Sequence, residues 1–243
     1  MGQPARLTAV VLALAVSWPG GVDARPRRRP DPFAVEPPAV ESTLAFRYAQ
    51  LTTEPCLAQL DARGVPYERV DPKKNVDTPI RFTGPIRGVT FAPTPRGGDA
   101  SLLPSTIADC RLALAIDDMA VVLKKYGVVR AEYLSMYRPN AFMKPGRRHP
   151  SALAIDLATI KLDSGQTYSV RYDFHGRVGA KTCGDKAAKP TKDTPGAKLW
   201  RNIACDLADK RSFNLLLTPN YNWGHRDHFH MEVRTGIRWY LIH

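Results

Sequence analysis

The sequence predicts an α+β fold in which an antiparallel sheet is flanked by helices. Segments with helical periodicity occur beside strand-like hairpins rather than alternating with single strands, and this arrangement argues against a parallel α/β sheet. The clearest hairpin signal is Asp163-Ser164-Gly165, a turn sequence between two strand-like runs. The chain has 243 residues, of which 44% are hydrophobic, and is therefore large enough to bury a substantial core.

The N-terminus has the features of a secretory signal peptide over residues 1–24. Arg6 precedes the apolar run 7–16, and Val22-Asp23-Ala24 resembles a small-residue cleavage site. The run is shorter than the roughly 20 apolar residues that a transmembrane helix needs, and no later stretch reaches that length. The sequence therefore predicts a secreted protein, in the periplasm or outside the cell, with no transmembrane segment.

The next segment, residues 25–42, is expected to be a linker, because it contains five prolines and no periodic apolar pattern. We therefore assign the folded domain to residues 43–243. Its first elements are a helix over 54–63, which ends at Gly64, and a strand over 65–70. Beyond them, a stretch rich in Pro, Gly and Thr indicates loops with short strands, at residues 80–82 and 88–91.

A long helix is expected over residues 106–126. Thr106 and Asp109 resemble a capping box at its start, and Gly127 is a stop signal at its end. Apolar residues recur along one face at helical spacing, at Leu112, Ile116, Met119 and Leu123. We expect this helix to be part of the core rather than of a functional site.

The second half of the domain is predicted to supply most of the sheet. Apolar or alternating runs indicate strands, at residues 128–137, 153–162, 167–172 and 227–234. The second and third of these strands form the hairpin with the Asp-Ser-Gly turn. A helix over about 197–210 follows a lysine-rich loop that begins at Cys183.

Four cysteines in an exported chain predict two disulfides, for which three pairings are possible. We favour Cys56–Cys110 and Cys183–Cys205, because each pair is local and leaves the central motif region unbridged. No Cys-x-x-Cys pair is present, so a cysteine-based metal site is not expected.

The net charge of +12 suits a polyanionic partner. No helix-turn-helix, zinc-finger or RNA-binding aromatic motif is visible, so we do not expect a nucleic acid partner. For an exported bacterial protein the nearer polyanion is the cell envelope. The basic residues are scattered, however, and a generally basic surface without a specific partner explains the charge equally well.

Three of the six histidines fall in one short segment, Gly224-His225-Arg226-Asp227-His228-Phe229-His230. Alternate residues of a strand face the same side, so His228 and His230 should project together. Two imidazoles at this spacing can form half of a metal site. Because paired surface histidines are common, this segment is weak evidence when taken alone.

The other half of a metal site is His149-Pro150-Ser151-Ala152-Leu153-Ala154-Ile155-Asp156. Asp156 interrupts an apolar run, and a carboxylate is costly to bury unless it is paired or bound to a cation. The alternatives are a salt bridge to an arginine for Asp156, and a simple loop position beside Arg147 and Arg148 for His149. Taken together, the two segments supply the three ligands and the open fourth position of a catalytic zinc site.

These motifs resemble those of the zinc peptidases that include D-alanyl-D-alanine carboxypeptidases, murein endopeptidases and lysostaphin-type enzymes. More closely, the chain is similar to the extensin-like protein C-terminal domain family of bacteria, over roughly residues 50–235. The segments that carry the resemblance are Ser135-Met136-Tyr137-Arg138, His149 to Asp156, and His225 to His230.

At two positions the sequence departs from the family pattern, and these departures affect which residue roles of the family can be assigned to this chain. Ala152 stands where the family usually has glycine, a minor change if the backbone φ there is negative. Arg138 follows Tyr137 directly, without the usual intervening residue. This shift leaves Arg147 and Arg148 as competing candidates for the role of that arginine.

The resemblance implies a fold like that of the hedgehog domain and the D-alanyl-D-alanine peptidases, with zinc held by His149, Asp156 and His230 and with water completing the shell. It implies that His228 handles the proton. Asp227 is the rival base, although strand geometry turns it away from the last ligand, and it also suits a role in holding a histidine tautomer.

The same resemblance suggests two substrate-binding residues. His225 would orient the substrate or the oxyanion, or only hydrogen-bond the loop. Arg138 would bind a substrate carboxylate or serve as a structural arginine. The implied function is a secreted zinc-dependent peptidase that hydrolyses peptide bonds of bacterial cell-wall peptidoglycan. Its partners would be peptidoglycan peptides or another anionic envelope polymer. The alternative is a zinc-stabilised cell-wall-binding module that keeps the ligands but does not turn over substrate.

Overall fold

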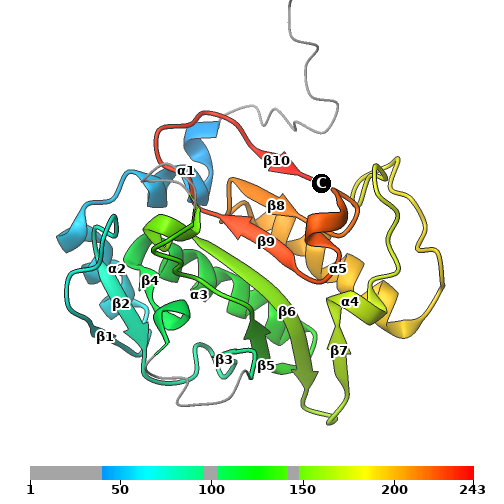
Figure 1. Cartoon of the computed structure of the whole chain (residues 1–243), viewed down its shortest axis with the longest axis horizontal. Helices are drawn as coiled ribbons and strands as arrows, with labels where there is room; N and C mark the ends of the chain where they lie inside the picture. Colours follow the sequence, from blue (N-terminus) through cyan, green and yellow to red (C-terminus); the bar gives the residue numbers. More distant parts are fainter. Residues whose placement is uncertain (1–39, 96–102, 142–147) are drawn as a thin grey trace, which may run out of the picture. The chain divides into compact units, whose positions relative to one another are not determined.

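The structure is a computed structural model that describes residues 40–95, 103–141 and 148–243. These residues form a seven-stranded sheet and a three-stranded sheet with flanking helices (Figure 1), which confirms the predicted α+β class. The signal peptide expected at 1–24 lies outside the described residues, and so does the expected linker except for the short 3-10 helix Val40–Ser42. Within the described ranges, no helix is long and apolar enough to cross a membrane.

The large sheet has the strand order β10-β8-β9-β6-β5-β3, and β7 pairs with β6. Its strands are β3 (Thr90–Pro93), β5 (Val128–Tyr133), β6 (Ala154–Leu162), β7 (Thr167–Ser169), β8 (Leu215–Leu217), β9 (Phe229–Glu232) and β10 (Leu241–Ile242). The β3–β5 and β10–β8 pairs are parallel, whereas the pairs in between are antiparallel. The sheet is therefore mixed, with an antiparallel centre.

The small sheet and the helices complete the domain. The small sheet has the order β1-β2-β4 and consists of β1 (Tyr67–Arg69), β2 (Pro79–Phe82) and β4 (Ala108–Asp109). The helices are α1 (Leu44–Ala49), α2 (Thr53–Ala62), α3 (Cys110–Lys125), α4 (Val170–Asp173) and α5 (Pro195–Lys210). Figure 1 shows α3 and α5 behind the large sheet, so the opposite face of its central strands remains open to build a site.

The long helix α3 is the core scaffold that the periodic pattern predicts. All four residues of the predicted apolar face are fully buried, namely Leu112, Ile116, Met119 and Leu123. The helix begins at Cys110 rather than at Thr106, because the side chain of Asp109 caps it by accepting from the N–H of Arg111. Residues Pro104–Thr106 form a separate 3-10 turn before it.

Three predicted strands end earlier in the structure than the sequence indicates. The strand expected over 128–137 ends at Tyr133, where an irregular register shifts its pairing with β6. The hairpin strand expected over 167–172 ends at Ser169, whose N–H donates to the carboxylate of Asp173, and α4 begins there. The strand expected over 227–234 is confined to β9, so His228 immediately precedes the strand.

Both predicted disulfides are confirmed. Cys56–Cys110 joins α2 to the first residue of α3 with a sulfur–sulfur distance of 2.05 Å. Cys183–Cys205 joins α5 to the lysine-rich loop. Next to Cys110, the N–H of Asp109 donates to the carbonyl of Ala152 at 2.9 Å, which connects the start of α3 to the turn before β6.

A buried carboxylate on α3 ties several helices together. Asp118 accepts hydrogen bonds from the hydroxyl of Tyr48 at 2.6 Å and from that of Ser212 at 2.7 Å. Tyr48 belongs to α1, and Ser212 follows α5 in the chain. One carboxylate therefore satisfies polar groups from both neighbouring helical segments in a buried environment.

Replacing Asp118 with alanine is expected to lower the free energy of unfolding by about 2–4 kcal/mol, because it leaves two buried hydroxyls without an acceptor. Urea unfolding with the disulfides intact measures this loss. A matched control is Asp206→Ala on α5, which removes a carboxylate from a more exposed pair with Lys125, and whose effect should be much smaller. Equal effects of the two variants would contradict the role of the buried network.

Candidate metal centre

The register of the central strands brings Asp156 and His230 together. In the antiparallel β6–β9 pair, Asp156 lies directly opposite His230. Their neighbours Ile155 and Phe229 are fully buried in the hydrophobic core. Because alternate residues face opposite sides of a sheet, the carboxylate and the imidazole both point to the face away from that core.

His149 reaches the same place from a tight turn before β6. It begins the 3-10 turn His149–Ser151, and the chain then passes through Ala152 at φ 51°, in the left-handed region. The positive φ means that the condition for a minor change, a negative φ at this position, is not met. A residue with a Cβ in this backbone conformation is strained by about 1–2 kcal/mol. The strain lies at the sharp turn by which the chain enters β6.

The three predicted ligands converge, and each is almost completely buried. The Nε2 atom of His149 lies 3.1 Å from Oδ2 of Asp156, and Nδ1 of His230 lies 2.7 Å from Oδ1. Possible ligand atoms of these three residues all lie within 4.8 Å of one another. Two imidazoles and one carboxylate are the donor set of many three-ligand catalytic zinc sites.

Each of the two buried imidazoles is anchored through its other nitrogen. Nδ1 of His149 lies 2.9 Å from the carbonyl oxygen of Met136, and Nε2 of His230 lies 2.5 Å from Oε1 of Glu232. A carbonyl or carboxylate oxygen only accepts, so the anchored nitrogen carries the hydrogen. The remaining nitrogen of each ring therefore faces Asp156 and is available to a cation, as the outer hydrogen bonds of metal-binding histidines require.

The pKa values reflect how strongly these groups interact. Burial would raise the pKa of Asp156, but the hydrogen bonds with His149 and His230 hold it well below its usual range. Burial would lower the pKa of His230, but its bonds with Asp156 and Glu232 raise it to about 9. Burial dominates for His149 and lowers its pKa. These interactions favour the charged forms of both Asp156 and His230.

Glu232 is a site residue that the sequence reasoning missed. It is fully buried. Its carboxylate accepts from Arg234 and lies 3.3 Å from Nε of Arg148, in addition to its bond with His230. Strand periodicity could have indicated this residue, because Glu232 lies two residues after His230 and therefore faces the same side of the strand.

The arginines around the site have partners in the structure. Nη2 of Arg138 lies 3.3 Å from Oδ2 of Asp156, although its side chain is 49% exposed. This contact is the arginine salt bridge that was the alternative for Asp156. Arg148, one of the competing candidates, pairs instead with Glu232. The other candidate, Arg147, lies outside the described residues.

His228 faces the site although it precedes β9. Its Nε2 atom lies 3.5 Å from Oδ1 of Asp156. Its Nδ1 atom lies 2.8 Å from Oδ1 of Asp227. Asp227 is thus placed to orient a histidine, which is the second of the two roles considered for it.

His225 borders the same pocket from the 3-10 turn Trp223–His225. Nδ1 of His225 lies 2.8 Å from Oδ1 of Asn222, and its ring contacts Tyr221 at 5.5 Å between centroids. Burial, followed by the nearby charges of His230 and His228, lowers the pKa of His225 to about 4.

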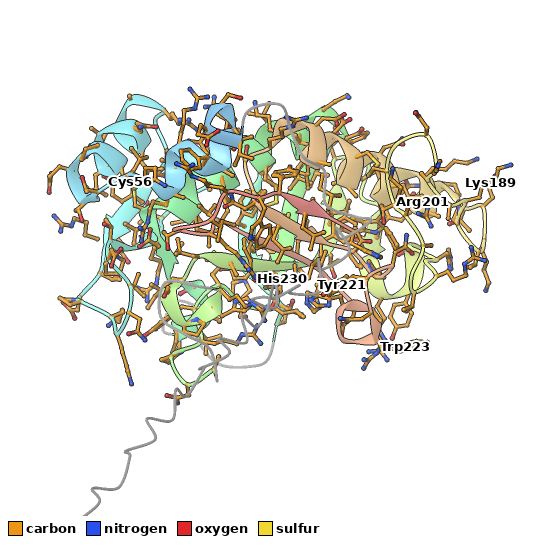
Figure 2. The ribbon with its side chains drawn as sticks, turned by 90° about the horizontal axis from the view of Figure 1, so that it is seen from above. Cys56, Lys189, Arg201, Tyr221, Trp223 and His230 are labelled. Carbon is orange, nitrogen blue, oxygen red and sulfur yellow. A yellow bond between two sulfur atoms is a disulfide. The ribbon has the colours of Figure 1, made fainter. Side chains whose placement is uncertain are left out.

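The three candidate ligands, His225, His228 and Arg138 line one pocket of about 870 Å³. Aromatic and basic side chains form its walls, including Tyr221, Trp239, Arg138 and Arg226. Tyr221 and His230 both line the pocket, whereas Trp223 is exposed at the surface (Figure 2). The pocket therefore combines a potential metal centre with room for a ligand of small-peptide size.

The family model for the extensin-like protein C-terminus matches residues 54–241. The chain belongs to this family. The match includes every predicted site residue and both disulfides of the extensin-like domain. No curated protein and no solved structure is similar enough to the chain to count as a match.

Replacing Glu232 with glutamine should weaken binding of Zn²⁺ by about 10–100-fold, the usual effect of losing an outer hydrogen-bond partner of a metal-binding histidine. The amide keeps an acceptor for His230 but loses the charge that holds Arg148 and Arg234. Competition with a chromophoric chelator measures the affinity. The matched control is Glu132→Gln on β5, which pairs with Arg130 away from the site. If both variants bind Zn²⁺ like the wild type, the positioning role is wrong.

Proposed function

We propose that this extensin-like protein is a secreted zinc-dependent peptidase that hydrolyses peptide bonds of bacterial cell-wall peptidoglycan, in the periplasm or outside the cell. The observation that carries the proposal is the pair of anchored imidazoles of His149 and His230. Each turns a nitrogen toward the buried carboxylate of Asp156. Two neutral histidines and a carboxylate leave a fourth position open for water or substrate on zinc.

A zinc ion at this position would lower the pKa of a water molecule and polarise the carbonyl of the scissile peptide bond. The protein's own residues have to move the proton. His228 is suited to accept it, because Nε2 faces the centre while Nδ1 is bonded to Asp227. Asp227 would fix the ring orientation and stabilise the charged imidazole, in the manner of a histidine-orienting carboxylate.

The arginines of the pocket suit a substrate that carries carboxylates. Zinc on Asp156 would compete with Arg138 for the same carboxylate and release the arginine toward the pocket. A guanidinium binds a carboxylate through two parallel hydrogen bonds. Peptidoglycan peptides end in such a group, and the net charge of +12 favours their approach or that of another anionic envelope polymer.

The competing function is a zinc-stabilised wall-binding module with no turnover. It would need the same three ligands and the same basic pocket, so the two functions differ only in whether product forms. The bond between Asp227 and His228 supports the enzyme, because it orients a third histidine beside the two proposed histidine ligands, where it could move a proton.

Replacing His230 with alanine should abolish tight zinc binding and, with it, hydrolysis of purified muropeptides. His228→Ala should keep one tightly bound zinc ion and lower turnover by roughly 10²–10⁴-fold, the usual contribution of a positioned acid or base. Zinc content by elemental analysis, together with product release followed by chromatography, tests both variants. His175→Asn is a matched control, since His175 lies outside the pocket.

Two outcomes would contradict parts of this proposal. If the wild type binds zinc tightly but releases no product from any wall peptide, the protein is the binding module. If His228→Ala loses the tight zinc ion as His230→Ala does, His228 is a ligand of the first ion rather than the proton acceptor.

A further inference from the structure

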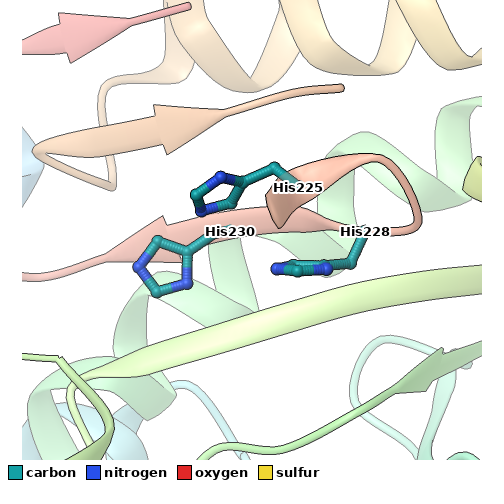
Figure 3. A group of neighbouring side chains, drawn as sticks. All are labelled: His225, His228 and His230. Atoms are coloured by element: carbon teal, nitrogen blue, oxygen red, sulfur yellow. The ribbon is translucent and has the colours of Figure 1, made fainter. Parts of the chain in front are cut away.

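A second set of nitrogen donors lies beside the three-ligand site. His225, His228 and His230 project into one space from the turn before β9 and from β9 itself (Figure 3). Possible ligand atoms of the three residues all lie within 4.8 Å of one another. A tetrahedral zinc ion requires donors about 3.4 Å apart, given metal–nitrogen bonds of about 2.0–2.1 Å. Small side-chain rotations would satisfy that requirement.

The hydrogen bonds of His225 leave one of its nitrogens free for a cation. Oδ1 of Asn222 accepts from the backbone N–H of Gly224 at 2.9 Å, which fixes the orientation of the amide. The same oxygen lies 2.8 Å from Nδ1 of His225. An amide oxygen only accepts, so Nδ1 carries the hydrogen and Nε2 keeps its lone pair.

His228 is arranged in the same way. The carboxylate of Asp227 accepts from Nδ1, so in the neutral ring the lone pair of Nε2 faces Oδ1 of Asp156 at 3.5 Å. A lone pair opposed to a carboxylate oxygen is unfavourable in a nearly dry site. A cation placed between the two atoms turns this repulsion into two favourable contacts.

His230 cannot be a ligand of both metal ions, because one of its two nitrogens is already hydrogen-bonded to Glu232. Asp156 can be shared, because it has two oxygens. Both of its oxygens lie near Nε2 of His149, and Oδ1 also faces His228. A carboxylate that bridges two metal ions about 3.5–4 Å apart is a common arrangement.

We propose a second transition-metal site with Nε2 of His225 and Nε2 of His228 as its nitrogen ligands and the Asp156 carboxylate as a bridge to the first ion. Possible ligand atoms of the two histidines lie within 4.8 Å of each other, and Oδ1 of Asp156 lies 3.5 Å from Nε2 of His228, so Asp156 joins the site on the side of His228. Its nitrogen-rich donor set suits Zn²⁺, Cu²⁺ or Ni²⁺ rather than Mg²⁺ or Ca²⁺. The second ion binds more weakly than the first. It shares one carboxylate with another dication, and its two histidines are less buried than His149 and His230.

This inference extends beyond the proposed peptidase activity and does not depend on it. It does add one consequence if that activity is present. Nε2 of His228 cannot hold a metal ion and accept a proton at the same time. Excess zinc should therefore lower turnover as the second site fills.

The test is zinc stoichiometry by equilibrium dialysis and elemental analysis over a range of free Zn²⁺. The wild type should bind two ions per chain, the second at least tenfold more weakly than the first. His225→Phe, which keeps a ring against Tyr221 but removes both nitrogens, should bind only the tight ion. His149→Ala should lose the tight ion and keep a weak one. His175→Asn, a histidine variant outside the pocket, should bind two.

The possible failures are distinguishable. A wild type that binds one ion at every concentration, retained in His225→Phe, overturns the second site and leaves the proposed zinc centre intact. A second ion that persists in His225→Phe is bound elsewhere on the surface and also overturns it. A protein that binds no zinc overturns both proposals. Circular dichroism shows whether each variant is folded, and Cu²⁺ titration of the same set provides an independent count.

Discussion

Burial of the Asp156 carboxylate at the centre of the large sheet is the constraint on which the rest of the site depends. The residue is only 2% exposed, and an unpaired charge in such a place would cost several kcal/mol. The structure offsets that cost with His149, His230 and Arg138, which all lie within 3.3 Å of the carboxylate oxygens. A cation bound between Asp156, His149 and His230 could take over the neutralising role of Arg138, so the same buried charge also favours a metal at this place.

The partners of Asp156 are themselves held in place. Met136 orients His149, Glu232 orients His230, and Asp227 orients His228. These anchors come from two segments of the chain, the loop after β5 and the stretch that includes β9. Because every anchor is an acceptor, each ring presents a nitrogen without hydrogen to the centre unless it takes up a second proton. The outer hydrogen bonds therefore preorganise the rings of the candidate site.

Local sequence patterns predicted much of the scaffold. The periodicity of α3, the helix before Gly64, the strand over 153–162 and the disulfide pairings all follow from short-range rules and are present in the structure. Sequence patterns were less informative where tertiary contacts determine the length and boundaries of an element. Strand β8 is only three residues long, and α4 begins where Asp173 captures the N–H of Ser169. Secondary-structure propensities do not predict a side-chain contact of this kind.

For the site, the sequence by itself indicated which side chains could hold a metal, because the His149–Asp156 segment and the His-x-His segment together supply the donors of a three-ligand site, although each segment alone is weak evidence. It did not determine that Asp156 and His230 would be register partners, since strands 74 residues apart pair through the whole sheet. Only the tertiary structure decided the role of Glu232, the orientation of Asp227 toward His228, and the left-handed backbone at Ala152. Each depends on how distant segments meet around one buried charge, and that is a property of the packed fold rather than of any local stretch of chain.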